Sequence, residues 1–159
     1  MLSDYSVRKY KIGDIEQVVN VYKRSVEEIG PEKYSPEQVR VWASYPDNII
    51  EFNRALKSGY TLVAESSEGE IASFGSITSA AHISLMFTLK EHTGKGIAGF
   101  IYRKLEEYAI EKGGKHITTE ASLIALPFFE KQGFKVLEKE TVERQGIALD
   151  RYKMEKNLS

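Results

Sequence analysis

The segment Lys90-Glu91-His92-Thr93-Gly94-Lys95-Gly96-Ile97-Ala98-Gly99 decides the fold, because it joins an expected strand to the helix with the clearest apolar face. Small residues at this junction let the backbone approach a ligand, and the first N–H groups of a helix carry partial positive charge. Lys95 adds a formal charge beside them. The segment therefore predicts a turn that binds a phosphate or pyrophosphate; a plain tight turn between strand and helix is the alternative.

Apolar spacing on either side of this segment predicts alternating groups of strands and helices. The chain begins with a strand and three helices, at residues 5–12, 14–29, 35–44 and 49–56. Three strands follow, at residues 60–65, 71–77 and 82–89, and then a helix over residues 96–112. A strand at 117–122, a short helix at 125–131 and a hairpin of strands 134–143 and 147–154 complete the order. Hairpins combined with one strand–helix–strand crossover predict an α/β (mixed α+β) fold with a mixed, mostly antiparallel sheet of about seven strands and helices on both faces.

Composition restricts the class of protein. The 159 residues fit one domain spanning 1–159, and 22 Lys and Arg against 23 Asp and Glu argue against a nucleic-acid partner. The absence of cysteine removes disulfides and thiolate chemistry, and the three histidines have no metal-ligand spacing, so no metal is expected. With no apolar run of membrane-spanning length and no signal peptide, we expect a cytoplasmic protein without membrane partners. Exposed strand edges make a homodimer plausible.

The glycines also allow an NAD site. Gly94, Gly96 and Gly99 satisfy G-x-G-x-x-G, and Glu120 follows at about the distance at which dinucleotide-binding folds place an acidic residue. However, four polar residues separate Leu89 from Gly94, and the hairpins downstream do not suit a parallel sheet. An NAD-binding protein is therefore the third reading of the function.

Three motifs in order resemble the GNAT family of acyl-CoA-dependent N-acetyltransferases. They are LMFT at 85–88, TGKGIA at 93–98 and ALPFFEKQGF at 125–134. The family's loop signature, [Gln/Arg]-x-x-Gly-x-[Gly/Ala], is met by Gly96 and Ala98. Because the expected order of elements is also that of the family, the resemblance covers nearly the whole chain. It implies the GNAT fold and acetyl-CoA (coenzyme A) as the co-substrate.

The resemblance also implies which residues hold acetyl-CoA. Backbone groups of Phe87, Thr88 and Leu89 would bind the pantetheine arm as an added strand. The pyrophosphate would be wrapped by the loop made of Thr93, Gly94, Lys95, Gly96, Ile97 and Ala98. Thr93 stands where the family has Gln or Arg, and it is expected to cap the following helix. Ser122, Phe128 and Phe129 would lie near the pantetheine.

Two positions depart from the family at the reacting centre. Ser122 stands where Asn is common, and Phe129 stands where a Tyr commonly protonates the leaving thiolate. Phenylalanine cannot donate a proton, but a thiol with a pKa near 8.5 leaves tolerably as thiolate. Phe129 therefore favours a second reading, a non-catalytic module that binds or senses acyl-CoA.

Catalysis requires a base, because an alkylammonium with a pKa near 10.4 is mostly protonated at neutral pH and only the free amine attacks a thioester. Glu120 is the first candidate and His82 the second, with Ser122 on the same strand face as Glu120. The alternative for Glu120 is a plain ion pair with a neighbouring lysine. The alternative for His82 is a solvated histidine at the end of a strand. By resemblance, Tyr34 and Trp42 would line the pocket for the amine, although Trp42 suits the core equally well.

The first reading is therefore an N-acetyltransferase that transfers the acetyl group of acetyl-CoA to a primary amine of a small molecule, protein or peptide. Attack would be direct, in a ternary complex, because no cysteine is present to form an acyl-enzyme.

Overall fold

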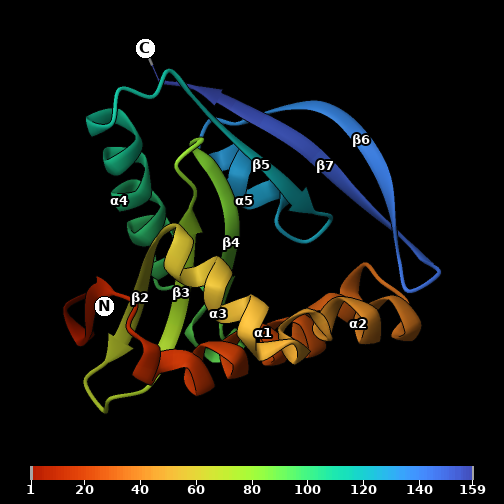
Figure 1. Ribbon diagram of the computed structural model, residues 1–159, viewed down its shortest axis with the longest axis horizontal. Coiled ribbons are helices and arrows are strands. Elements are labelled where there is room, and N and C mark those ends of the chain that lie inside the picture. The colour runs from red at the N-terminus through yellow and green to blue at the C-terminus, as the bar shows by residue number, and fades with distance from the viewer. Residues whose placement is uncertain (1, 159) are drawn as a thin grey trace.

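The computed structural model describes residues 2–158 and has one seven-stranded sheet with five α-helices (Figure 1). The helices are α1 (Ile15–Ile29), α2 (Pro36–Ala43), α3 (Ile49–Ser58), α4 (Ile97–Glu111) and α5 (Leu126–Lys131). The strands are β1 (Tyr5–Lys9), β2 (Tyr60–Ser66), β3 (Ile71–Ile77), β4 (His82–Thr88), β5 (His116–Ser122), β6 (Lys135–Arg144) and β7 (Ile147–Asn157). They lie in the order β1-β2-β3-β4-β5-β7-β6. The predicted mixed α/β architecture is confirmed.

Local sequence signals explain the segment that will cover the site. Ser35 accepts a hydrogen bond from the Gln38 N–H, and the Gln38 side chain accepts one from the Ser35 N–H. This capping box satisfies two amides at the beginning of α2, and Pro36 supplies a backbone angle suited to the first turn. The sequence therefore fixes where α2 begins.

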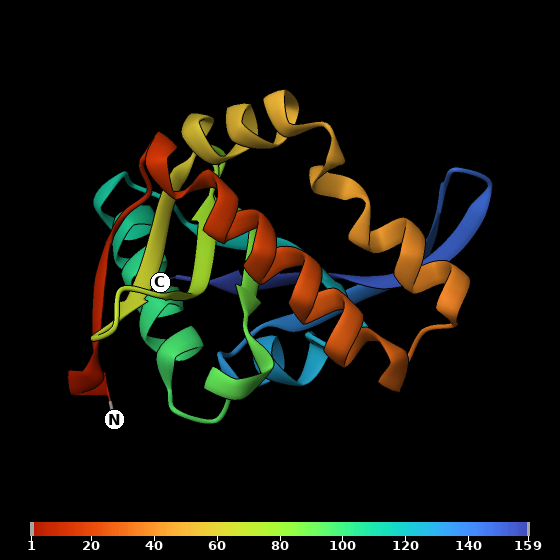
Figure 2. The same cartoon turned by 90° about the horizontal axis from the view of Figure 1, so that it is seen from below.

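Helices cover both faces of the sheet (Figure 2). Successive residues of β2 show this division, because Val63 packs with the core under α1–α3 whereas Leu62 and Ala64 pack with the core under α4 and α5. Alternating side chains of a strand point to opposite faces. Two apolar cores therefore fix β2, β3 and β4 between two helical layers.

The sheet consists of two unequal parts. The N-terminal half-sheet (β1–β4) contains β3, in which every residue is buried. The C-terminal half-sheet (β5, β7 and β6) ends in β6, which is exposed at most positions. Figure 1 shows this second part turning away from β4.

The two parts meet at a short parallel pairing. β4 and β5 are in register at His82↔Thr118 and Ile83↔Thr119. Ser84 has no partner in β3, because the β3–β4 register passes from Ser76↔Leu85 to Ile77↔Ile83, and this bulge bends β4. Beyond this pairing the strands separate; we call this region the β4–β5 split.

The hairpin of β6 and β7 returns to α2 (Figure 2). The Tyr34 hydroxyl donates to the Asp150 carbonyl at 2.8 Å, and the Gln38 amide donates to the Ala148 carbonyl at 2.9 Å. At the hairpin turn, the Gln145 amide lies 2.9 Å from the Ser44 hydroxyl. These bonds close the space beside the β4–β5 split.

Within residues 2–158, no helix has the length and apolar character that crossing a membrane requires. The observed sheet also bears on the NAD reading. β4–β5 is the one parallel pair described, whereas the dinucleotide-binding fold needs a parallel sheet. The glycine fingerprint is therefore not part of such a fold.

Candidate functional site

A cavity of about 510 Å³ lies between the β4–β5 split, the α2–α3 region and the β6–β7 hairpin. We call it the larger cavity. Its floor includes Ser84, Glu120 and Ser122 from the two separating strands. Leu85 and Phe87 of β4 also line it. The helices α1–α3 and the segments between them, which we call the helical cover, contribute Tyr22, Tyr34, Val41, Trp42, Ser44, Tyr45 and Asn48. The β6–β7 hairpin contributes Val142, Arg144, Gln145, Leu149, Asp150 and Arg151.

A smaller cavity of about 60 Å³ lies in the β4–β5 split itself. It shares Ser84, Glu120 and Ser122 with the larger cavity, and Phe129 of α5 lines its other side. The two spaces therefore adjoin at these shared residues. A group that entered between the strands would meet a group held in the larger cavity at Glu120.

The two candidate bases lie together. His82 Nε2 is 3.3 Å from Glu120 Oε1, and His82 Nδ1 is 2.7 Å from the Thr118 hydroxyl. The parallel register that pairs His82 with Thr118 places Glu120 one residue beyond the last pair. Glu120 is partly exposed and lines both cavities. The structure thus brings together two residues that the sequence analysis considered separately.

Arg151 is a functional candidate that the sequence analysis did not identify. It lies opposite Ser122 in the β5–β7 register, with its Nη1 3.8 Å from Glu120 Oε1. Its Nε donates to Glu140 Oε2 at 2.6 Å. The residue could not be identified before the strand register was known, because nothing in its local sequence distinguishes it from the other cations of the hairpin.

Aromatic side chains form one wall of the larger cavity. Both predicted residues belong to it, with the Tyr34 and Trp42 rings 5.2 Å apart. Phe87 and Tyr22 extend the wall, with ring centroids 4.5 Å apart. Trp42 also packs against the core, and its contact with an amine stays a prediction.

The Tyr34 hydroxyl is a structural connection. It accepts a hydrogen bond from the Leu123 N–H at 2.9 Å while it donates to Asp150. Burial raises the pKa of Tyr34, and the bond from Leu123 opposes that change. The hydroxyl therefore joins the helical cover to the C-terminal half-sheet, while the largely buried ring lines the larger cavity.

The glycine segment forms an open loop before α4. Gly94 and Gly96 have φ values of +77° and +83°, and a Cβ at either position would meet no atom within 4 Å. Gly96 is the N-cap of α4 and offers no side-chain acceptor to the first amides of the helix. The first amides of α4 therefore receive no side-chain cap from residue 96, and their binding of a phosphate stays a prediction.

The prediction that Thr93 caps this helix is wrong. Its hydroxyl donates to the Lys90 carbonyl at 2.7 Å, closing the short turn before the loop. The helix begins four residues later, at Ile97, after the left-handed Gly96. Lys95 lies within the loop, with its Nζ 3.5 Å from the Tyr5 hydroxyl. Ile97 is buried beneath the loop, and Ala98 follows it in the first turn of α4.

The predicted pantetheine-binding backbone is partly occupied. The Leu89 N–H donates to the Ala72 carbonyl, and the Thr88 carbonyl accepts from the Ser25 hydroxyl. The Phe87 carbonyl accepts from the Ser73 hydroxyl. A carbonyl oxygen can accept a second bond, whereas an N–H cannot readily donate twice. The carbonyl oxygens of these residues could therefore still accept a hydrogen bond from the pantetheine arm, as predicted. The Leu89 N–H could not donate one, because it is already bonded.

Of the remaining predicted cofactor residues, Ser122 and Phe129 line the smaller cavity and Phe128 does not. The Ser122 Oγ accepts from the Ala125 N–H at 3.0 Å and so anchors the turn into α5. Phe129 is buried, with its ring 5.2 Å from Phe128 and 5.1 Å from Phe134. The aromatic ring thus fills the position where the resemblance implies a tyrosine, and its edge bears no hydroxyl.

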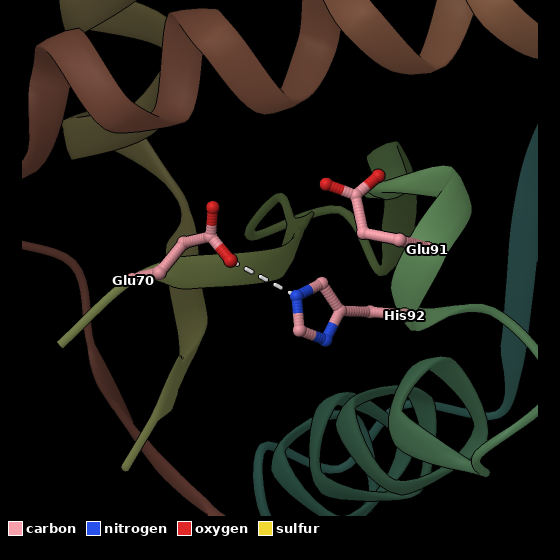
Figure 3. A group of neighbouring side chains, drawn as sticks. All are labelled: Glu70, Glu91 and His92. Atoms are coloured by element: carbon pink, nitrogen blue, oxygen red, sulfur yellow. Dashed lines mark hydrogen bonds and ion pairs between the residues drawn. The ribbon is translucent and has the colours of Figure 1, made fainter. Parts of the chain in front are cut away.

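Three side chains beside the loop could share a cation, namely Glu70, Glu91 and His92 (Figure 3). His92 Nε2 lies 3.0 Å from Glu70 Oε1, and its Nδ1 lies 2.6 Å from the Tyr5 hydroxyl. Arg24 donates to both Glu91 oxygens at 3.0 Å. Each of the three side chains thus already has a protein partner, and these bonds attach the segment that precedes the loop to Tyr5, Glu70 and Arg24.

Comparisons with known proteins agree with this geometry. A family model described as an acetyltransferase (GNAT) domain matches residues 31–156. The Escherichia coli (strain K12) N-acetyltransferase YafP is 27% identical over 146 residues, covering 91% of each chain. The N-acetyltransferase YjcF of Bacillus subtilis (strain 168) is 38% identical over 59 residues, which are 37% of this chain and 42% of that protein.

Solved structures share the same fold. A GCN5-related N-acetyltransferase from Rhodopseudomonas palustris superposes with a TM-score of 0.94 at 28% identity, covering 99% of this chain and 98% of that chain. The PaiA N-acetyltransferase of Thermoplasma acidophilum, solved with coenzyme A, has a TM-score of 0.79 at 19% identity and covers 97% and 99% of the two chains. The domain match and the fold together identify the chain as a member of the GNAT acetyltransferase family.

Proposed function

We propose that the protein is an N-acetyltransferase that transfers the acetyl group of acetyl-CoA to a primary amine. The observation that carries the proposal is the β4–β5 split, which opens where Glu120 begins to line both cavities. A thioester placed between the strands would meet an amine from the larger cavity at this carboxylate. The glycine loop follows the C-terminal end of β4, the end at which β4 and β5 separate, and would take the pyrophosphate there.

The reaction is a direct transfer. The free amine attacks the thioester carbonyl carbon, a C–N bond forms, the C–S bond breaks and coenzyme A leaves as thiolate. Glu120, directly or through a water, accepts the proton that the amine nitrogen loses. His82, whose Nε2 lies 3.3 Å from Glu120 Oε1, would hold the carboxylate in position. Acetyl-CoA supplies the acyl group.

Phe129 determines how the thiolate leaving group is protonated. The buried ring can exclude water from the thioester but cannot protonate sulfur, so the thiolate would take its proton from solvent. The same observation favours the second candidate function, a module that binds or senses acyl-CoA without transferring it.

Thermal unfolding with acetyl-CoA and, separately, with NAD tests the cofactor. Acetyl-CoA at about one hundred times its Kd stabilises the native state by about 2.7 kcal/mol. For this chain length the midpoint would rise by about 5–10 °C. A rise with NAD alone would contradict the proposal.

Glu120→Gln then separates transfer from sensing. We expect kcat, measured as thiol release, to fall by about 10²- to 10⁴-fold while the acetyl-CoA-dependent rise in unfolding midpoint persists. Glu138→Gln, an exposed carboxylate of β6, is the matched control and should leave thiol release unchanged. Acetyl-CoA binding without thiol release in the native protein, for every amine supplied, would support the sensing module instead.

A further inference from the structure

Two arginines line the larger cavity, and Arg151 is the one whose guanidinium lies beside Glu120. Arg151 presents five N–H groups, of which Nε is bonded to Glu140. Its Nη1 lies 3.8 Å from Glu120 Oε1, which is too long for a hydrogen bond. The Arg151 side chain is about one quarter exposed, at 27%, and it lines the cavity. An anion in the cavity would therefore find donors beside the proposed base.

The carboxylates of the cavity are not equally available. Asp150 accepts from the Thr141 hydroxyl at 2.6 Å and has Lys139 at 3.8 Å. These contacts use both oxygens of Asp150, whereas the contacts of Glu120 with His82 and Arg151 both fall on Oε1. Oε2 of Glu120 is thus the lining carboxylate oxygen with room for an ammonium group. Because Arg151 stands beside it, a second ammonium on the same acceptor would be repelled. This arrangement disfavours a polyamine.

The spacing of the two charges restricts the acceptor further. Glu120 and Arg151 are neighbours on one sheet face, so one small molecule can reach both with an amine and an anion a few bonds apart. The other cation of the lining, Arg144, is at the hairpin turn, where it pairs with Ile147. Along β7, Ile147 is about 20 Å from Lys153, the residue opposite Glu120. Arg144 would therefore suit only a much longer acceptor.

The aromatic wall indicates the rest of the molecule. Trp42, Phe87 and Tyr22 offer apolar ring surface beside the charged floor. An acceptor that places its charged end between Glu120 and Arg151 would extend its remaining atoms along these rings. Burial of an apolar group there stabilises the complex by the area removed from water.

Resting on the proposed acetyltransferase function, we infer that the acceptor is a small amphoteric amine of the α-amino acid type, with its ammonium group on Glu120, its carboxylate on Arg151 and an apolar or aromatic side chain against the rings. Arg151 is in this case a specificity-determining residue. It binds the group that decarboxylated amines lack.

The test compares amines that differ only in the carboxylate. L-Phenylalanine is paired with 2-phenylethylamine, and L-leucine with 3-methylbutylamine, and kcat/KM is measured by thiol release from acetyl-CoA. The native protein should prefer the amino acid of a pair. Arg151→Gln should lower that preference by about 10- to 100-fold, because a charge-assisted hydrogen bond is lost. Arg151→Lys should restore part of it. The two amines of a pair differ in intrinsic reactivity. This difference cancels when the preference of a variant, as a ratio of kcat/KM values, is divided by the preference of the native protein.

Two measurements keep the result interpretable. Arg40→Gln, an exposed arginine of α2 outside the cavity lining, should leave the preference unchanged. The acetyl-CoA-dependent rise in unfolding midpoint should be the same in all variants, which shows that each is folded and binds the co-substrate.

Several outcomes would overturn the inference while the proposed function stands. These are equal kcat/KM for both members of each pair, a loss of preference in Arg144→Gln and not in Arg151→Gln, or thiol release with a polyamine such as spermidine and with none of the four amines. Failure of the proposed function looks different, since then no amine releases thiol from bound acetyl-CoA.

Discussion

The two half-sheets of this molecule are held together by different forces. In the N-terminal half-sheet, β3 is buried along its whole length between two apolar cores. In the C-terminal half-sheet, β6 is mostly exposed, and ion pairs join it to β7 through Arg151 and Lys153. Apolar burial contributes much more stability than exposed ion pairs do. The comparison indicates that the N-terminal half-sheet contributes more of the apolar core, to which the C-terminal half adds Ile117, Ala121 and Met154. The C-terminal half-sheet carries Glu120 and Arg151 of the site.

The largest expected effect is the difference in stability loss between two side-chain truncations, one in each half-sheet. Phe74→Ala in β3 removes a fully buried ring, and we expect the free energy of unfolding to fall by about 3–5 kcal/mol. Leu137→Ala in β6 removes a side chain that is 59% exposed, and we expect a change within about 0.5 kcal/mol. Denaturant unfolding measures both. Equal losses would show that the half-sheets contribute alike.

A second test compares a buried carboxylate with an exposed one. Asp14 accepts two hydrogen bonds from Arg8, at 2.8 and 2.9 Å, and one from the Lys11 N–H. Asp14→Asn should cost about 1–2 kcal/mol at neutral pH, because charge-assisted hydrogen bonds are lost. Glu138→Gln, whose partner Lys153 is 3.9 Å away, should cost less than about 0.5 kcal/mol.

The pH dependence checks the cause of the Asp14 effect. The hydrogen bonds from Arg8 hold the pKa of Asp14 below its ordinary value. A lowered pKa in the folded state stabilises the protein above the unfolded-state value, near 3.9, and this contribution disappears as pH falls through the folded-state pKa. The difference in stability between the native protein and Asp14→Asn should therefore shrink below about pH 4. A difference that stays constant down to pH 2 would exclude the ionised Asp14 as its source.

The smallest expected effect comes from two glycine substitutions, which together distinguish backbone strain from a loss of ligand binding. Gly96 in the loop and Gly146 in the hairpin turn both have positive φ, +83° and +78°, with open space around the missing Cβ. Alanine at either position should cost about 1 kcal/mol of stability, since the left-handed conformation is unfavourable for it. Only Gly96→Ala should also weaken acetyl-CoA binding, by about 5- to 10-fold, because only that strain distorts amides proposed to hold the pyrophosphate. Equal Kd values for the two variants, measured by titration calorimetry, would remove the loop from the binding site.

Much of this fold could be predicted because its signals are local. The capping box of Ser35 and Gln38 and the apolar face of α4 follow from spacing along a single element. The observed order of strands and helices agrees with that prediction, with ends that differ by a few residues. Thr93 was misjudged because hydroxyl capping depends on where the helix begins, and the left-handed Gly96 delays that point.

The site was predictable only in part, because its geometry comes from pairing between strands. Glu120 and His82 each have a chemical signature, but their contact depends on the parallel register of His82 and Thr118. Arg151 depends on the antiparallel register with Ser122 in the same way. The roles of these residues, like the predicted homodimer and the cytoplasmic location, stay predictions.

The bond between the Tyr34 hydroxyl and the Leu123 N–H makes that amide a reporter of a partial opening. Leu123 lies in a turn after β5, outside any strand ladder, so its protection against hydrogen exchange depends on the helical cover staying attached. The Val63 amide, in the middle of β2, is protected by the global stability of the fold. Exchange at Leu123 would thus report the free energy needed to detach the helical cover from the larger cavity. Slower exchange at Val63 would show that this opening does not require the protein to unfold.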